Sequence, residues 1–66
     1  MIELILILET ENDKIYNYFN STDYLEEYLK NINLNSYCYT NILFKIDDEI
    51  DFKLSKMYKK RYLNPS

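Results

Sequence analysis

Side chains that could do chemistry are few in this chain, and most of them are carboxylates and phenols. The 66 residues include no histidine, no glycine and a single cysteine, Cys38. Acid–base catalysis near neutral pH most often uses histidine, and a Ser–His or Cys–His nucleophile cannot be assembled without it. Zinc sites need several cysteine or histidine ligands, and phosphate-binding loops need glycine. We therefore expect no enzyme, no cofactor and no metal site.

The acidic residues fall into three groups along the chain. They are Glu9, Glu11 and Asp13; Asp23, Glu26 and Glu27; and Asp47, Asp48, Glu49 and Asp51. Rows of carboxylates can present a phosphate-like potential to a basic groove and steer association at long range. The alternatives are ordinary solubility and, for the last group, a magnesium ion, although a solvated acidic turn is the simpler interpretation. We expect the three groups to contact a basic partner.

Eight tyrosines and three phenylalanines form 17% of the chain. Four of the tyrosines are expected to share the sheet face that the first helix leaves uncovered, together with Ile5, Ile7 and Leu43. These are Tyr16, Tyr18, Tyr37 and Tyr39. An apolar patch of this size usually marks a contact, and tyrosine is enriched at binding hot spots. The C-terminal helix covering this face, a homodimer and a contact with a partner or nucleic acid are the alternatives.

Charge is distributed unevenly between the two parts of the chain. Residues 1–51 carry three lysines against all eleven acids, a net −8, whereas residues 52–66 carry five cations and no acid. The cations are Lys53, Lys56, Lys59, Lys60 and Arg61. Such asymmetry is informative about partners. The cations could contact phosphates, but the acidic remainder argues against nucleic acid. We expect this segment to dock on an acidic surface of its own chain or of a second copy.

Hydrophobic periodicity predicts the elements that position these groups. Residues 2–9 are apolar on both faces of a strand, which is typical of the centre of a sheet. A polar turn and an alternating segment at residues 14–19 complete a hairpin. Leu25, Tyr28, Leu29 and Ile32 then follow the helical period, with Ser21 as the expected N-cap. A third strand is predicted at residues 37–46.

The resulting fold class is α+β. A hairpin, a helix and a returning strand give a three-stranded antiparallel-type sheet in the order 2-1-3, with the helix on one face. The last third is ambiguous, because residues 50–54 alternate like a strand but also belong to a helical stripe. We favour a basic helix from about residue 52 to 63, and the alternative is a fourth strand at residues 49–55. Residues 1–66 form one small domain.

The compartment is inferred from the cysteine content and from the apolar segments. A single thiol forms no disulfide within the chain, which favours a reducing cytosol. The apolar segment at residues 2–8 is too short to span a bilayer and lacks the basic start of a targeting signal, so no membrane is expected. Ile, Leu, Lys, Asn and Tyr dominate the composition, which indicates an A/T-rich genome such as that of a low-GC bacterium or its phages.

Residues 2–46 combine a hairpin, an amphipathic helix, a third strand, an acidic surface and tyrosines. In architecture and composition this outline resembles small phage-encoded inhibitors, including DNA-mimicking inhibitors of uracil-DNA glycosylase and anti-CRISPR proteins. The resemblance implies a protein that evades host defence by binding a host factor. It has no short sequence motif, so no functional residue is carried over from these families. The basic C-terminal segment departs from a pure DNA mimic.

We therefore expect an acidic, phage-encoded inhibitor in the cytoplasm of the host cell. Its partner would be a host protein with a basic surface, namely a nucleic-acid-handling defence protein such as a CRISPR effector. Two other functions stay open. One is a nucleic-acid-binding regulator that uses the Lys/Arg helix and stacking tyrosines, and the other is a homo-oligomeric accessory protein, for example a homodimer.

Overall fold

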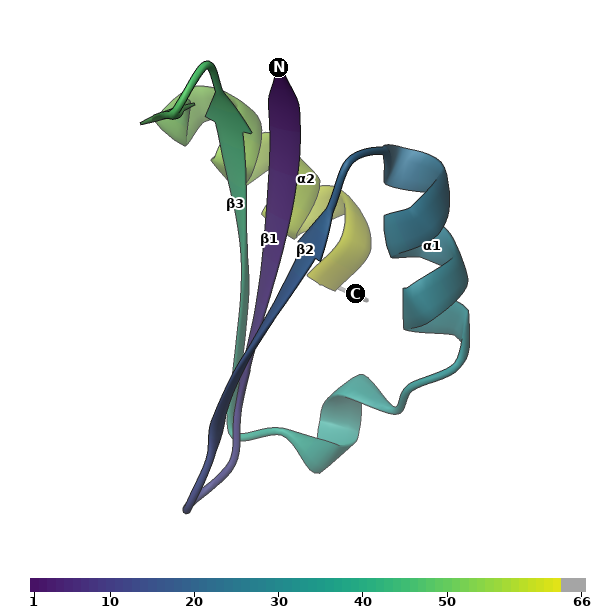
Figure 1. Cartoon of the computed structure of the whole chain (residues 1–66). Coiled ribbons are helices and arrows are strands. Elements are labelled where there is room, and N and C mark those ends of the chain that lie inside the picture. Colours follow the sequence, from purple (N-terminus) through teal and green to yellow (C-terminus); the bar gives the residue numbers. More distant parts are fainter. Residues whose placement is uncertain (64–66) are drawn as a thin grey trace.

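The computed structural model describes residues 1–63, which form an antiparallel sheet with two helices (Figure 1). In chain order the elements are β1 (Ile2–Glu9), β2 (Lys14–Phe19), α1 (Thr22–Lys30), the 3-10 turn η1 (Leu34–Ser36), β3 (Tyr39–Ile46), β4 (Glu49–Ile50) and α2 (Phe52–Leu63). The sheet order is β2-β1-β3-β4. The α+β class and the order 2-1-3 are confirmed, with a short fourth strand added beyond β3.

Strand β1 is the centre of the sheet, as its two apolar faces predicted. It pairs antiparallel with β2 on one side and with β3 on the other. Leu4, Leu6 and Leu8 are fully buried on one face, and Ile5 and Ile7 are buried on the other. A strand that is hydrogen-bonded on both edges and apolar on both faces is typical of the centre of a sheet.

Both helices pack on the face of the sheet that carries Leu4, Leu6 and Leu8 (Figure 1). The core cluster contains these three leucines with Leu25, Ile42 and Phe44. Helix α1 contributes Leu25, and the partly buried side chains around the cluster include Leu54, Tyr58 and Tyr62 of α2. Helix α2 therefore lies on the same side as α1 and does not cover the opposite, tyrosine-bearing face.

Helix α1 begins where its capping residue predicts. Ser21 is the N-cap, and its hydroxyl accepts a hydrogen bond from the Tyr24 N–H. The helix buries Leu25, and the ring of Tyr28 lies 5.5 Å from the ring of Phe19 at the end of β2. Asn31 ends the helix as its C-cap. The capped, amphipathic segment thereby closes one side of the core.

The ambiguous last third contains both predicted alternatives. Glu49–Ile50 form β4, and α2 spans Phe52–Leu63, which are the bounds favoured from sequence. The strand alternative for residues 49–55 holds only for its first two residues, because Asp51 starts the helix. Its carboxylate accepts from the Leu54 N–H, and the Ser55 N–H bonds to its carbonyl. An aspartate that caps a helix N-terminus interrupts the strand.

The third strand begins at Tyr39, two residues later than the sequence pattern indicated. The turn η1 precedes it, and the Tyr37 N–H donates to the Leu34 carbonyl at 3.2 Å. Tyr37 therefore belongs to the turn that leads into β3. Its own backbone is extended, with φ of −112° and ψ of 140°, but its N–H bonds within the turn and not to β1. Alternation assigns a side only to residues in the strand ladder.

Candidate functional site

The sheet face away from the helices carries an aromatic and aliphatic centre. Directly opposed residues of antiparallel strands share a face, so the pairing of Ile5 with Tyr18 and Leu43, and of Ile7 with Tyr16, defines this surface. Tyr39 lies on the same face, opposite Glu9. We call Ile5, Ile7, Tyr16, Tyr18, Tyr39 and Leu43 the tyrosine face.

The phenols of the tyrosine face are exposed, although the isoleucines between them are buried. Tyr18 is 60% exposed, Tyr16 46% and Tyr39 44%. Ile5 and Ile7 are covered by the side chains of the flanking strands, since no helix lies on this face. The result is an apolar floor surrounded by amphipathic rings that combine contact area with a hydroxyl.

Tyr37 does not belong to the tyrosine face, and its assignment to it was wrong. Its side chain is partly buried and packs against the core cluster on the helix side. Tyr16, Tyr18 and Tyr39 are on the face as predicted. The error follows from the late start of β3, because a residue outside the strand has no fixed side of the sheet.

Charged residues lie at both ends of the tyrosine face and balance one another. Lys45 Nζ lies 3.8 Å from Glu3 Oε1, and Lys14 is opposite Glu9 in the register. The Lys14 ammonium lies 5.6 Å from the centre of the Tyr16 ring. Tyr16 first, and the charge of Glu9 after it, raise the pKa of Lys14. Each lysine of this face therefore has a glutamate beside it.

Two of the three acidic groups lie at opposite ends of the sheet. Glu9, Glu11 and Asp13 surround the β1–β2 turn, whereas Asp47, Asp48 and Glu49 form the β3–β4 turn. Strand β1 has eight residues, and a rise of about 3.3 Å per residue separates the ends by roughly 25 Å. The ends are acidic and the centre is aromatic.

Several predicted acidic residues have structural partners. Asp51 caps α2, Glu26 accepts a hydrogen bond from the Tyr62 hydroxyl at 2.6 Å, and Asp47 pairs with the Met1 ammonium at 2.6 Å. That ammonium lowers the pKa of Asp47. Asp23 and Glu27, like Glu26, belong to α1, which is on the helix side. The ten acids therefore do not form one surface.

The five cations of the C-terminal segment are exposed on α2. Lys59 Nζ lies 5.8 Å from the centre of the Tyr39 ring, and Arg61 lies over the Tyr62 ring at 5.5 Å. Within residues 1–63, none of the five forms an ion pair with a carboxylate. Lys53, Lys56 and Lys60 are close to one turn apart, and Met57 beside them is also exposed. Docking on an acidic surface of the same chain is not observed.

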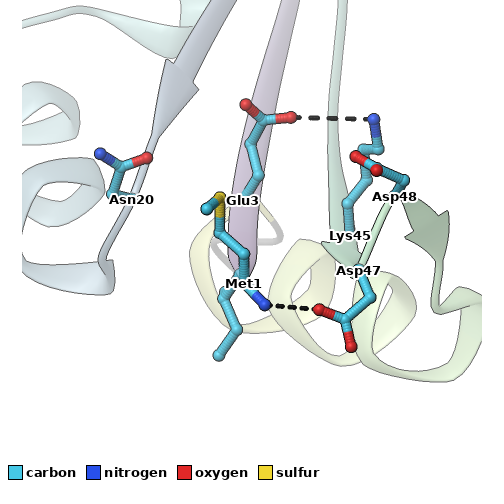
Figure 2. A pocket seen from close by; sticks show the side chains of 7 residues that line it. Met1, Glu3, Asn20, Lys45, Asp47 and Asp48 are labelled. Atoms are coloured by element: carbon cyan, nitrogen blue, oxygen red, sulfur yellow. Dashed lines mark hydrogen bonds and ion pairs between the residues drawn. The ribbon is translucent and has the colours of Figure 1, made fainter.

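A hollow of about 250 Å³ lies where β1 begins and β3 ends (Figure 2). Figure 2 shows that the Glu3 and Asp47 carboxylates point to cations, namely Lys45 and the Met1 amine. Ile2, Asn20 and Asp48 also line it. In the part of the chain that is described, no three His, Cys, Asp or Glu side chains are placed to share a metal ion. The hollow therefore contains two charge pairs, Glu3 with Lys45 and Asp47 with the Met1 amine.

The sequence patterns did not identify Glu3, Lys14 and Lys45, the charged residues on the same side of the sheet as the tyrosine face. Strand parity was the available signal, because Glu3 and Glu9 are two residues from Ile5 and Ile7. Lys45 follows from the register that pairs it with Glu3. The sequence patterns also missed Phe52 and Met57, which α2 leaves exposed, because a helical stripe does not reveal which side meets the core.

Comparison with known proteins identifies no relative. No family model, no curated protein sequence and no solved structure matches this chain. Neither helix in residues 1–63 has the length and apolarity that a membrane crossing requires. The function is therefore argued from the tyrosine face and the charges around it.

Proposed function

We propose that this chain is a small protein-binding inhibitor whose contact surface is the tyrosine face. The observation that carries the proposal is that Tyr16, Tyr18 and Tyr39 stand exposed around buried isoleucines, while both helices pack on the other side. A flat apolar centre with exposed phenols is the composition of an interface core. Tyrosine supplies large contact area with few rotatable bonds, which lowers the entropy cost of binding.

The charge around this face supports a partner with a basic surface. Acidic turns at both ends of the sheet flank the aromatic centre, and residues 1–51 carry a net −8. Complementary potentials steer encounter and exclude partners of the same sign. The two strand lysines of this face, Lys14 and Lys45, each lie beside a glutamate, and Lys59 of α2 reaches the ring of Tyr39. The partner would therefore place apolar side chains on the tyrosines and basic side chains near Glu11, Asp13 and the β3–β4 turn.

A basic surface is typical of proteins that bind nucleic acid. The proposed target is accordingly a nucleic-acid-handling defence protein of the host, such as a CRISPR effector, and the proposed setting is the host cytoplasm. The A/T-rich composition and the outline shared with small phage inhibitors support a phage origin. Binding at the groove would exclude the nucleic acid by occupying its site.

Affinity capture with matched tyrosine variants tests this proposal. Tyr18→Ala removes the most exposed phenol of the face, and we expect the affinity for the captured target to fall roughly 30-fold, as for a hot-spot residue. Tyr24→Ala is the control, because Tyr24 is 68% exposed but lies on α1. The affinity of this control should match that of the wild type. Mass spectrometry of retained proteins and titration of the purified target provide the readouts.

The salt dependence of the same interaction provides an independent check. Binding to a basic partner should weaken as ionic strength rises, because screening shortens the range of the acidic turns. Oligonucleotide carrying the target's own binding sequence should compete with the chain. Equal capture by Tyr18→Ala and wild type, or targets without nucleic-acid sites, would overturn the proposal.

A second candidate function is direct contact with nucleic acid through α2. The specific observation is that Lys53, Lys56 and Lys60 have no ion-pair partner within residues 1–63. The tyrosine face and this lysine row are on different sides of the molecule, so they do not form one stacking platform. A gel shift at low salt decides between the two, since retention of oligonucleotide that Lys56→Glu abolishes would favour the second candidate.

A further inference from the structure

The two edges of the sheet are finished differently. At the β3 edge, the Phe44 N–H donates to Ser55 Oγ at 2.7 Å, and the Phe44 carbonyl accepts from the Asp51 N–H at 2.8 Å. Strand β4 and the start of α2 therefore close the part of this edge from Phe44 to Ile46. Strand β2 is the other edge, with β1 as its only neighbour in the sheet. An open edge is a template for pairing with another strand.

The backbone direction on β2 follows from the hydrogen bonds of β1. The Met1 and Glu9 carbonyls both bond toward the β3 side, to the N–H groups of Asp47 and Cys38. Backbone groups alternate between the two edges of a strand. The even-numbered residues of β1 therefore face β2, and the register then turns the backbone of Lys14, Tyr16 and Tyr18 to the open edge. No protein group in residues 1–63 bonds to these outward backbone groups.

We propose that β2 pairs antiparallel with β2 of a second copy, about a two-fold axis that lies between the Tyr16 residues of the two copies. In this register Tyr16 stands opposite Tyr16 of the second copy, and Lys14 stands opposite Tyr18. Each outward N–H and C=O of Lys14, Tyr16 and Tyr18 then meets a complementary group, since their spacing of two residues matches an antiparallel ladder. The two sheets join into one continuous sheet.

The side chains of β2 fit this occupant better than an unrelated strand. No like charges oppose each other across the pair. The Lys14 ammonium lies over the Tyr16 ring and interacts with Glu9, so its charge does not block pairing at this edge. On the helix side, Ile15 is 38% exposed at this edge. The register places each Ile15 opposite Asn17 of the second copy, which covers its apolar surface.

Association of this kind adds buried surface to a small domain that has no disulfide. A domain of this size buries a smaller share of its surface on folding than a larger domain does, and Cys38 is free, so no disulfide supports the fold. The joined sheet keeps both tyrosine faces on one side, where they form a continuous surface. Edge pairing uses the backbone of β2 and leaves the phenols available.

Sedimentation equilibrium of the full chain and two variants tests the pairing. Wild type should reach twice the 8.1 kDa chain mass as concentration rises. Tyr16→Pro removes an N–H that points away from β1, so the fold should persist by circular dichroism while the dimer dissociation constant rises roughly 30-fold. Tyr16→Thr keeps the N–H and the strand preference, and it should dimerise within roughly fivefold of wild type.

Amide hydrogen exchange identifies the surface if Tyr16→Pro fails to fold. In the wild-type dimer, the amides of Lys14, Tyr16 and Tyr18 should exchange more slowly as concentration rises, and a mixed isotope-labelled sample should show contact between the α protons of Ile15 and Asn17 of different copies. A monomer at all concentrations overturns the pairing, as does a dimer with unprotected β2 amides. Protection that arises only when target is added would assign the edge to a target strand instead. The affinity of Tyr18→Ala for the target is measured separately from dimerisation, so target binding by the tyrosine face and pairing of β2 can each fail without the other.

Discussion

Asp47 and Asp48 occupy the two central positions of the turn between β3 and β4, and both have left-handed backbone, with φ of 50° and 69°. This conformation at both positions matches the twist of a two-residue hairpin. Aspartate tolerates it better than most residues, although it still costs energy relative to glycine. The chain contains no glycine, so the strain at this turn is not relieved.

At the residue scale, Asp48→Gly should stabilise the fold. Glycine adopts positive φ without a Cβ clash, and the free energy of unfolding should rise by about 1 kcal/mol. Urea denaturation followed by circular dichroism measures the change. Asp13→Gly is the matched control, because it removes the same charge at a turn residue without positive φ, and it should not stabilise. Equal effects of the two variants would attribute the gain to charge.

At the element scale, the hydroxyl of Ser55 joins α2 to β3. It accepts from the Phe44 N–H at 2.7 Å and donates to the Asp51 carbonyl at 2.7 Å, and Ser55 is buried. The rings of Phe44 and Tyr58 stack beside this contact with centroids 5.0 Å apart. One serine thus satisfies a backbone group at the sheet edge and sets where the helix begins.

Ser55→Ala should therefore destabilise the protein by about 2 kcal/mol, because it leaves a buried N–H without a partner. Thermal and urea unfolding measure the loss. Ser36→Ala, at an exposed serine of η1, is the control and should change stability by less than about 0.5 kcal/mol. If Ser55→Ala matched this control, α2 would be held by its apolar contacts alone.

At the scale of the whole molecule, both helices lie on one side of the sheet. Tyr62 connects the two helices by donating its hydroxyl proton to Glu26. Burial first, and the bond to Glu26 after it, raise the pKa of Tyr62 above its ordinary 10.0. The folded state thus favours the neutral phenol. The associated stability is complete below about pH 10 and is lost as pH rises through the folded-state pKa.

Tyr62→Phe should remove this pH dependence and lower stability at neutral pH by about 1 kcal/mol, the net value of one hydrogen bond. Unfolding in urea between about pH 8 and 11 compares the slopes, and wild type should lose stability more steeply above pH 10. Tyr24→Phe, at an exposed phenol of α1, is the control for general tyrosine ionisation. Parallel slopes for wild type and Tyr62→Phe would contradict the role of this hydroxyl.

The sequence by itself determined most of the elements and the order of the first three strands. Leu4, Leu6 and Leu8 alternating with Ile5 and Ile7 predicted a central strand that is apolar on both faces, and Ser21 with Leu25 and Leu29 specified a capped helix. These signals are local, since periodicity and capping depend on neighbours within one or two turns. The central strand, the hairpin, α1 and α2 were predictable for that reason.

Only the tertiary structure decided which surface stays free. Whether α2 covers the tyrosines depends on the packing of its Leu54 and Tyr58 against the core. Tyr58 stacks on Phe44 there, and these residues are distant in sequence from Tyr16 and Tyr18. Tyr37 joined the core because a turn displaced the start of β3. Side-chain type predicts what a residue can contact, but long-range packing selects the side of the sheet, and a residue two positions outside a strand loses its assigned face.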